Sequence, residues 1–64
     1  MSNLQKVKVI AKKCGLTFEP TNSKINGAKL YNFVSASGYI VARNWTVSSA
    51  INEHDHGNLI DMLR

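Results

Sequence analysis

One run of residues in this chain could bind a metal or transfer protons, and it consists of Glu53, His54, Asp55 and His56. The two histidines stand two positions apart, so on a helix they point to different faces and converge only in a turn or a strand. A tetrahedral zinc site would need further Cys or His ligands, and no cysteine lies near this run. No glycine-rich phosphate loop or nucleophile motif occurs elsewhere. We therefore expect no metal site, no cofactor and no catalytic residue.

A second group of residues combines aromatic and cationic side chains within residues 30–45, which hold four of the five aromatic residues. In the hairpin register that we favour below, one face of a sheet carries Lys29, Tyr31, Phe33, Tyr39, Arg43 and Trp45. Such a face can stack bases on its rings while its cations meet phosphates. Tyr, Trp and Arg are also enriched at the hot spots of protein interfaces. Three interpretations stay open for the aromatic residues: a hydrophobic core, a protein interface or a nucleic-acid face.

The choice between these interpretations depends on the register of the hairpin. Residues 30–34 and 39–45 are rich in β-branched and aromatic residues, and residues 35–38 have turn chemistry. A two-residue loop of Ala36 and Ser37 would demand positive φ values that these residues supply poorly. A three-residue loop ending at Gly38 places glycine in the left-handed position, so we favour it. It pairs Ser35 with Tyr39, Phe33 with Val41, Tyr31 with Arg43 and Lys29 with Trp45.

In this register the other face of the hairpin is mainly aliphatic, and we expect the helices to cover it. The residues of that face are Leu30, Asn32, Val34, Ile40, Ala42 and Asn44. The predicted core therefore contains Val7, Ile10, Val34, Ile40 and Ile51. A slip of one residue would exchange the two faces.

Residues 2–14 predict an amphipathic helix. Ser2 and Gln5 have the spacing of a capping box, and Gly15 suits the left-handed residue that ends a helix. The apolar face is formed by Leu4, Val7, Ile10, Ala11 and Cys14. Four lysines flank it, Lys6 and Lys13 on one side and Lys8 and Lys12 on the other. These lysines either keep a core helix solvated or contact phosphates.

The remaining segments complete an α+β domain. Residues 16–19 alternate in polarity and predict a strand that Pro20 ends. Asn26-Gly27 is a strong turn signal, and Ile25 can extend a strand before it. After residue 45, Thr46 or Ser48 can cap a helix. That helix either stops near Gly57, before a short final turn, or continues with a kink. We predict the order αβββα, with a three-stranded antiparallel sheet and both terminal helices packed on one face, in a single domain over residues 1–64.

The composition limits the classes of protein to which this chain can belong. It has 64 residues, 44% hydrophobic and 19% charged, with a formal net charge of +4. The charge permits binding to nucleic acid or to an acidic protein surface. A single cysteine, Cys14, excludes an internal disulfide and fits a reducing compartment. No stretch is long and apolar enough to span a membrane, and residues 1–13 lack the features of a signal peptide. We expect a soluble cytoplasmic protein without a membrane partner.

The arrangement of these segments resembles small accessory proteins encoded by bacteriophages and prophages. The resemblance covers a capped helix, the strand GLTFE, the segments NGAKLYNF and GYIVARNW, and the helix start TVSSAI. It implies a non-enzymatic protein, monomeric or homodimeric, that binds and modulates or inhibits a host protein in a bacterial cytoplasm. The alternative is a small nucleic-acid-binding module that uses the basic helix and the aromatic face.

Overall fold

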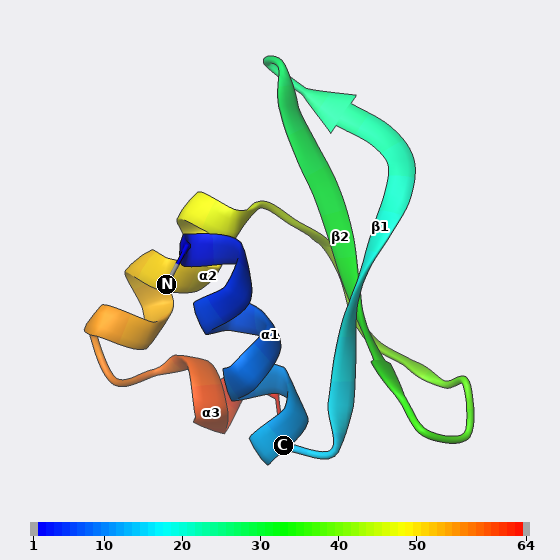
Figure 1. The fold of residues 1–64 in the computed structure, drawn as a ribbon, viewed down its shortest axis with the longest axis vertical. Coiled ribbons are helices and arrows are strands. Elements are labelled where there is room, and N and C mark those ends of the chain that lie inside the picture. The colour runs from blue at the N-terminus through cyan, green and yellow to red at the C-terminus, as the bar shows by residue number, and fades with distance from the viewer. Residues whose placement is uncertain (1, 64) are drawn as a thin grey trace.

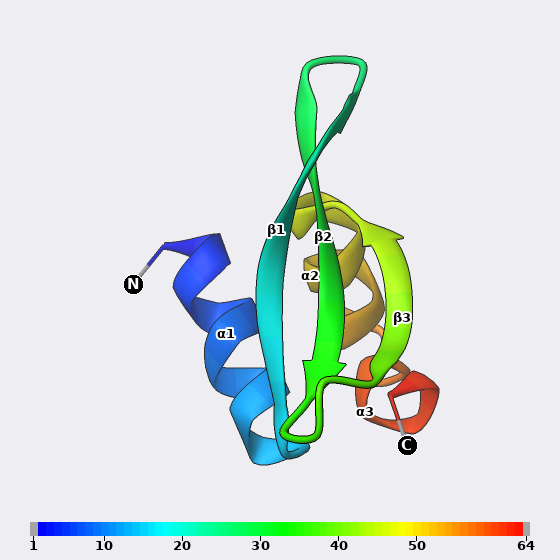
Figure 2. The same ribbon diagram turned by 90° about the vertical axis from the view of Figure 1, so that its right-hand side faces the viewer.

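The computed structural model describes residues 2–63 and has the predicted α+β architecture, αβββα with a divided last helix (Figure 1). Its elements are α1 (Asn3–Lys13), β1 (Leu16–Ile25), β2 (Ala28–Ser35), β3 (Ile40–Trp45), α2 (Val47–Asp55) and α3 (Leu59–Met62). The three strands form one antiparallel sheet in the order β1-β2-β3. The helices lie together on one face of this sheet, and the other face is uncovered by them (Figures 1 and 2).

Local signals set the ends of the helices. The Ser2 hydroxyl accepts a hydrogen bond from the Gln5 amide at 3.2 Å, and Gly15 follows α1 with φ +75°. At α2 the N-cap is Thr46, whose hydroxyl accepts from the Ser49 amide at 3.0 Å while the Ser49 hydroxyl accepts from the Thr46 amide at 3.1 Å. This reciprocal pair satisfies two amides that the first turn of a helix leaves unbonded.

Strand β1 runs past Pro20 to Ile25, so the prediction that Pro20 ends the strand is wrong. Proline is tolerated because β1 is an edge strand, where one side of the backbone has no neighbour in the sheet. Pairing with β2 is irregular between Pro20 and Lys24. Across this irregular stretch the Thr21 hydroxyl donates to the Leu30 carbonyl at 3.0 Å. The two strands then pair again as far as Ile25 and Ala28.

The predicted three-residue loop of the β2–β3 hairpin is confirmed. Gly38 has φ +88°, its amide donates to the Ser35 carbonyl at 2.9 Å, and the Ser35 amide donates to the Tyr39 carbonyl at 2.8 Å. Val34 then pairs with Ile40, as this loop requires. The predicted pairing fails beyond that point because the register shifts twice along β3.

These shifts give Phe33 paired with Ala42 and Tyr31 paired with Trp45, in place of Val41 and Arg43. Each shift is an irregularity of the bulge type, in which an extra residue of one strand is left without a direct partner. Asn44 has φ +60° in this part of β3, and its amide donates to the Asn32 side-chain oxygen at 3.1 Å. The Asn32 side chain thus provides a hydrogen-bond acceptor for the Asn44 amide in place of a backbone carbonyl of the neighbouring strand.

The core lies between the helices and the aromatic face of the sheet, so the predicted assignment of the two sheet faces is wrong. Phe18, Tyr31 and Phe33 are 3%, 8% and 0% exposed, whereas Val34 and Ile40 are only half-buried. The other buried residues are Val7, Ile10, Ala11, Leu16, Ala50, Leu59 and Leu63. Aromatic side chains bury more apolar area than valine or isoleucine, so covering them gives the larger hydrophobic gain.

Of the predicted core, Val7 and Ile10 are buried and Ile51 packs against the cluster from a half-buried position. None of the helices within residues 2–63 has the length and apolar character needed to cross a bilayer.

Candidate functional site

The structure separates the six residues predicted to form an accessible aromatic and cationic face. Tyr31 and Phe33 are buried, so the prediction that they are exposed is wrong. The Tyr31 ring stacks on Phe18 with centroids 4.4 Å apart and planes at 11°, and Phe33 meets the edge of Trp45 at 5.6 Å. Trp45 itself is half-buried against the core. These rings form a core cluster and offer no stacking platform.

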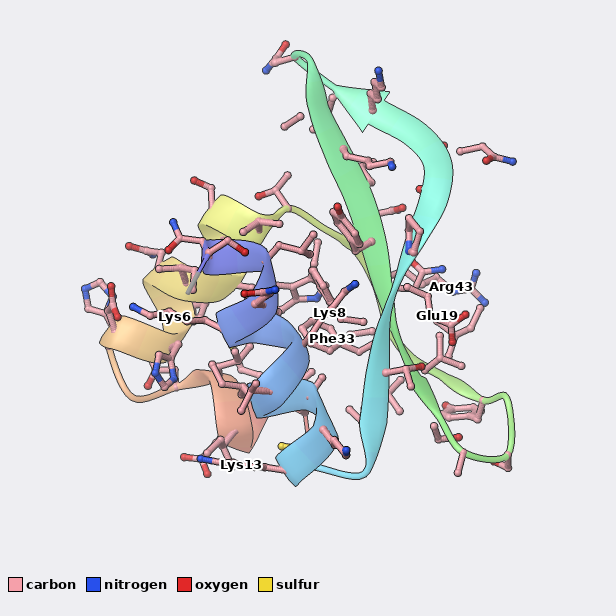
Figure 3. The ribbon with its side chains drawn as sticks, in the orientation of Figure 1. Lys6, Lys8, Lys13, Glu19, Phe33 and Arg43 are labelled. Atoms are coloured by element: carbon pink, nitrogen blue, oxygen red, sulfur yellow. The ribbon has the colours of Figure 1, made fainter. Side chains whose placement is uncertain are left out.

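The other members of the set are exposed but lie apart. Arg43 lies on the face of the sheet that the helices leave uncovered, together with Glu19, while Phe33 points from β2 toward α1 (Figure 3). Tyr39 is 69% exposed beside the β2–β3 loop. Lys29 is exposed near the opposite end of β2. No single accessible surface therefore joins the predicted six.

The four predicted phosphate-contacting lysines of α1 are all exposed and form two pairs. Lys8 extends toward the sheet, whereas Lys6 and Lys13 extend toward the side of α2 and α3 (Figure 3). Residues four apart are neighbours on a helix, so Lys8 and Lys12 share one border of α1. Both line an open groove of about 460 Å³ whose other wall is the start of β1. The residues of that wall are Leu16, Thr17 and Phe18.

A further cationic pair lies where the β1–β2 hairpin extends beyond the helical layer (Figures 1 and 2). We call this extension, residues 22–29, the β1–β2 arm; every residue in it is exposed. Lys24 and Lys29 stand directly opposite each other in it. Lys24 was not among the predicted site residues, although the Asn26-Gly27 turn signal places Lys24 and Lys29 symmetrically about a two-residue turn.

The charged residues of the chain are distributed unevenly. The α1 helix and the β1–β2 arm hold six of the eight Lys and Arg residues and none of the four acidic ones. Three acidic residues, Glu53, Asp55 and Asp61, lie in α2 and α3. The fourth, Glu19, accepts a 2.7 Å hydrogen bond from the Thr17 hydroxyl and lies on the uncovered sheet face (Figure 3). Neither α1 nor the β1–β2 arm contains an acidic residue, and the acidic residue bonded to the groove lining is Glu19, through Thr17.

The run from Glu53 to His56 spans the last turn of α2. A ring nitrogen of His56, Nδ1, lies 2.7 Å from the Asn52 carbonyl oxygen, so the imidazole interacts with the end of its own helix. In the part of the chain that the structure describes, no group of three or more His, Cys, Asp or Glu side chains is arranged to hold a metal ion.

Comparison with known proteins adds nothing to this geometry. The chain matches no protein-family model, and neither curated proteins nor solved structures gave a significant match.

Proposed function

We propose that this chain is a non-enzymatic protein that binds the phosphate backbone of nucleic acid. The contacts are made by a lysine strip that consists of Lys8, Lys12, Lys24 and Lys29. The observation that carries the proposal is the placement of these four exposed lysines: Lys8 and Lys12 of α1 line the groove beside the start of β1, and Lys24 of β1 faces Lys29 of β2 in the β1–β2 arm. No acidic residue lies in α1 or in the arm.

The chemistry of the strip fits a polyanion better than a folded protein partner. Lysine binds phosphate as a flexible point charge, whereas interface hot spots are enriched in Trp, Tyr and Arg. In this fold two of the aromatic residues predicted for a partner-binding face, Tyr31 and Phe33, are in the core, and the exposed Tyr39 and Arg43 lie outside the lysine strip. Clustered cations without aromatic anchors are the electrostatic footprint of backbone binding.

Binding of a fluorescent 20-base-pair duplex, measured by anisotropy over a range of salt concentrations, tests the proposal. Four phosphate contacts predict a log–log salt slope of about −3.6, because each contact contributes about −0.9 on B-DNA. Substituting Lys8→Gln and Lys12→Gln together should reduce that slope by about 2. Circular dichroism of each variant checks that the fold is intact.

The matched control is the pair Lys6→Gln and Lys13→Gln, which removes the same charge from the same helix on the side facing α2 and α3 (Figure 3). We expect it to change the slope by less than half as much. Equal effects of the two pairs would reduce the interaction to net charge and contradict the strip. Absence of binding at low salt would reject nucleic-acid binding altogether.

A second candidate function is the one that the phage-type resemblance implies, which is binding and modulation of a host protein. The supporting observation is the exposure of Tyr39 and Arg43, which belong to the residue types of interface hot spots. If this function holds, a captured protein is released by Tyr39→Ser or Arg43→Ala and retained by the lysine variants, after nuclease treatment of the lysate. Loss of capture on nuclease treatment would instead support the lysine strip.

A further inference from the structure

The β1–β2 arm has a defined shape. At its tip Asn26 and Gly27 have φ values of +51° and +80°, and Ile25 pairs with Ala28 across them. Positive φ at both central residues is the geometry of a type I′ turn, which matches the twist of the flanking strands. The arm is therefore a narrow twisted ribbon of two strands that extends beyond the helices (Figure 2).

The residues of the arm are exposed and do not pack in the core. Ile25 is 55% exposed, and Lys24 faces Lys29 across the ribbon, although like charges in that position destabilise a strand pair. An anionic ligand between or beside these lysines would remove the repulsion. The arm also presents amide and hydroxyl groups from Asn22, Ser23 and Asn26, all of them exposed.

These features match the major groove of duplex DNA. That groove is about 12 Å wide and admits a two-stranded β-ribbon, whereas the major groove of A-form RNA is too narrow for side chains to read. Asparagine can bond two atoms of an adenine edge, and an aliphatic side chain such as Ile25 can contact a thymine methyl group. Lys24 and Lys29 would then face the phosphates that border the groove.

Resting on the function proposed above, we propose that the chain binds double-stranded DNA with the β1–β2 arm in the major groove. Lys8 and Lys12 hold the adjacent backbone from α1. The arm supplies the preference for DNA, and the α1 lysines supply affinity that does not depend on the type of nucleic acid.

The experiment compares a 20-base-pair DNA duplex, the RNA duplex of the same sequence and the single DNA strand at one salt concentration. We expect the DNA duplex to bind about tenfold more tightly than the RNA duplex, since a single good base contact contributes a factor of five or more. Lys24→Gln with Lys29→Gln should weaken binding of the DNA duplex more than binding of the RNA duplex, because only DNA admits the arm, and so reduce the preference. Lys8→Gln with Lys12→Gln should weaken both duplexes by similar factors.

Methylation interference identifies the groove. Methylation of guanine N7, in the major groove, should reduce binding, whereas methylation of adenine N3, in the minor groove, should not. Asn26→Gly preserves the left-handed turn and removes the side chain, so it should reduce the DNA preference without unfolding the arm. Interference at adenine N3, or tighter binding of the single strand, would overturn the inference. Equal affinity for both duplexes with a steep salt slope would also overturn it while leaving the proposed function intact; no binding to any of the three would reject both.

Discussion

Single substitutions on the two faces of β2 test which face packs against the helices in the core. Phe33 is 0% exposed and lies against Phe18 at 4.7 Å and Trp45 at 5.6 Å between ring centroids, whereas its neighbour Val34 is half-buried on the opposite face. Truncating a buried Phe to Ala costs about 3–5 kcal/mol. A domain of this size has a total stability of about 3–10 kcal/mol, so that variant would not fold dependably. The milder change Phe33→Leu gives a measurable result.

Phe33→Leu removes two aromatic pairs, each contributing about 0.5–1.5 kcal/mol, and should lower the free energy of unfolding by about 1–3 kcal/mol. Val34→Ala removes two half-buried methyl groups and should cost about 0.8 kcal/mol. Urea denaturation can be followed by the fluorescence of Trp45, the single tryptophan. The free energy of unfolding of a domain this small falls by about 1 kcal/mol per molar urea. The urea midpoint should therefore fall by about 1–3 M for Phe33→Leu and by less than about 1 M for Val34→Ala. A larger effect of Val34→Ala would refute the aromatic core.

The other predictions concern the hairpin loop, the α2 cap and the β1–β2 arm. Gly38→Ala should lower the free energy of unfolding by about 1–2 kcal/mol, measured by urea denaturation, because the φ of +88° disfavours alanine although the added Cβ meets nothing within 4 Å. Gly38→Asn should cost less, because asparagine tolerates the left-handed conformation better. Equal costs would show that backbone conformation is not the cause. Thr46→Ala should cost about 1 kcal/mol through loss of the N-cap, whereas the exposed control Ser48→Ala should be nearly neutral by the same assay. Lys24→Gln should slow amide hydrogen exchange in residues 22–29 at low salt by relieving about 0.2–1 kcal/mol of repulsion, and unchanged exchange would show that the pair is already screened.

Features that depend on a few neighbouring residues could be predicted from the sequence. The Ser2 cap, the turn at Asn26-Gly27, the left-handed Gly38 and the Thr46 cap each depend on residues within three or four positions, and the structure shows all of them. The order of helices and strands could be predicted because these caps and turns mark where each element begins or ends.

The buried face of the sheet could not be obtained in the same way. The alternation of β2 places Tyr31 and Phe33 on one face, but it does not determine which face the helices cover. The predicted partners of Tyr31 and Phe33 were wrong for a separate reason, because the register shifts twice along β3. The large area of the aromatic rings was the available signal that these residues would be covered.

The lysine pairs of the candidate site could be predicted from the sequence, but their positions relative to the sheet could not. Helical spacing alone sorts the α1 lysines into the pairs Lys8–Lys12 and Lys6–Lys13. Which pair borders the sheet depends on how α1 packs against β1, which the spacing does not determine. Lys24 was missed because Pro20 was taken as the end of the first strand, and the possible strand at Ile25 was not paired with Lys29 across the Asn26-Gly27 turn.

The aromatic cluster and the β1–β2 arm are linked through Tyr31. Tyr31 is buried, stacks on Phe18, and pairs with Pro20 on one side and Trp45 on the other, immediately before the stretch where β1 and β2 lose their regular pairing. The buried part of the sheet therefore ends at the base of the arm, and the exposed arm begins beyond it. A narrow ribbon with facing lysines gains little stability by itself, and the hydrogen bond from the Thr21 hydroxyl to the Leu30 carbonyl links the two strands across the irregular stretch. Under the proposed function, the buried aromatic residues would anchor the base of the arm that carries Lys24 and Lys29, so their burial would support binding rather than prevent it.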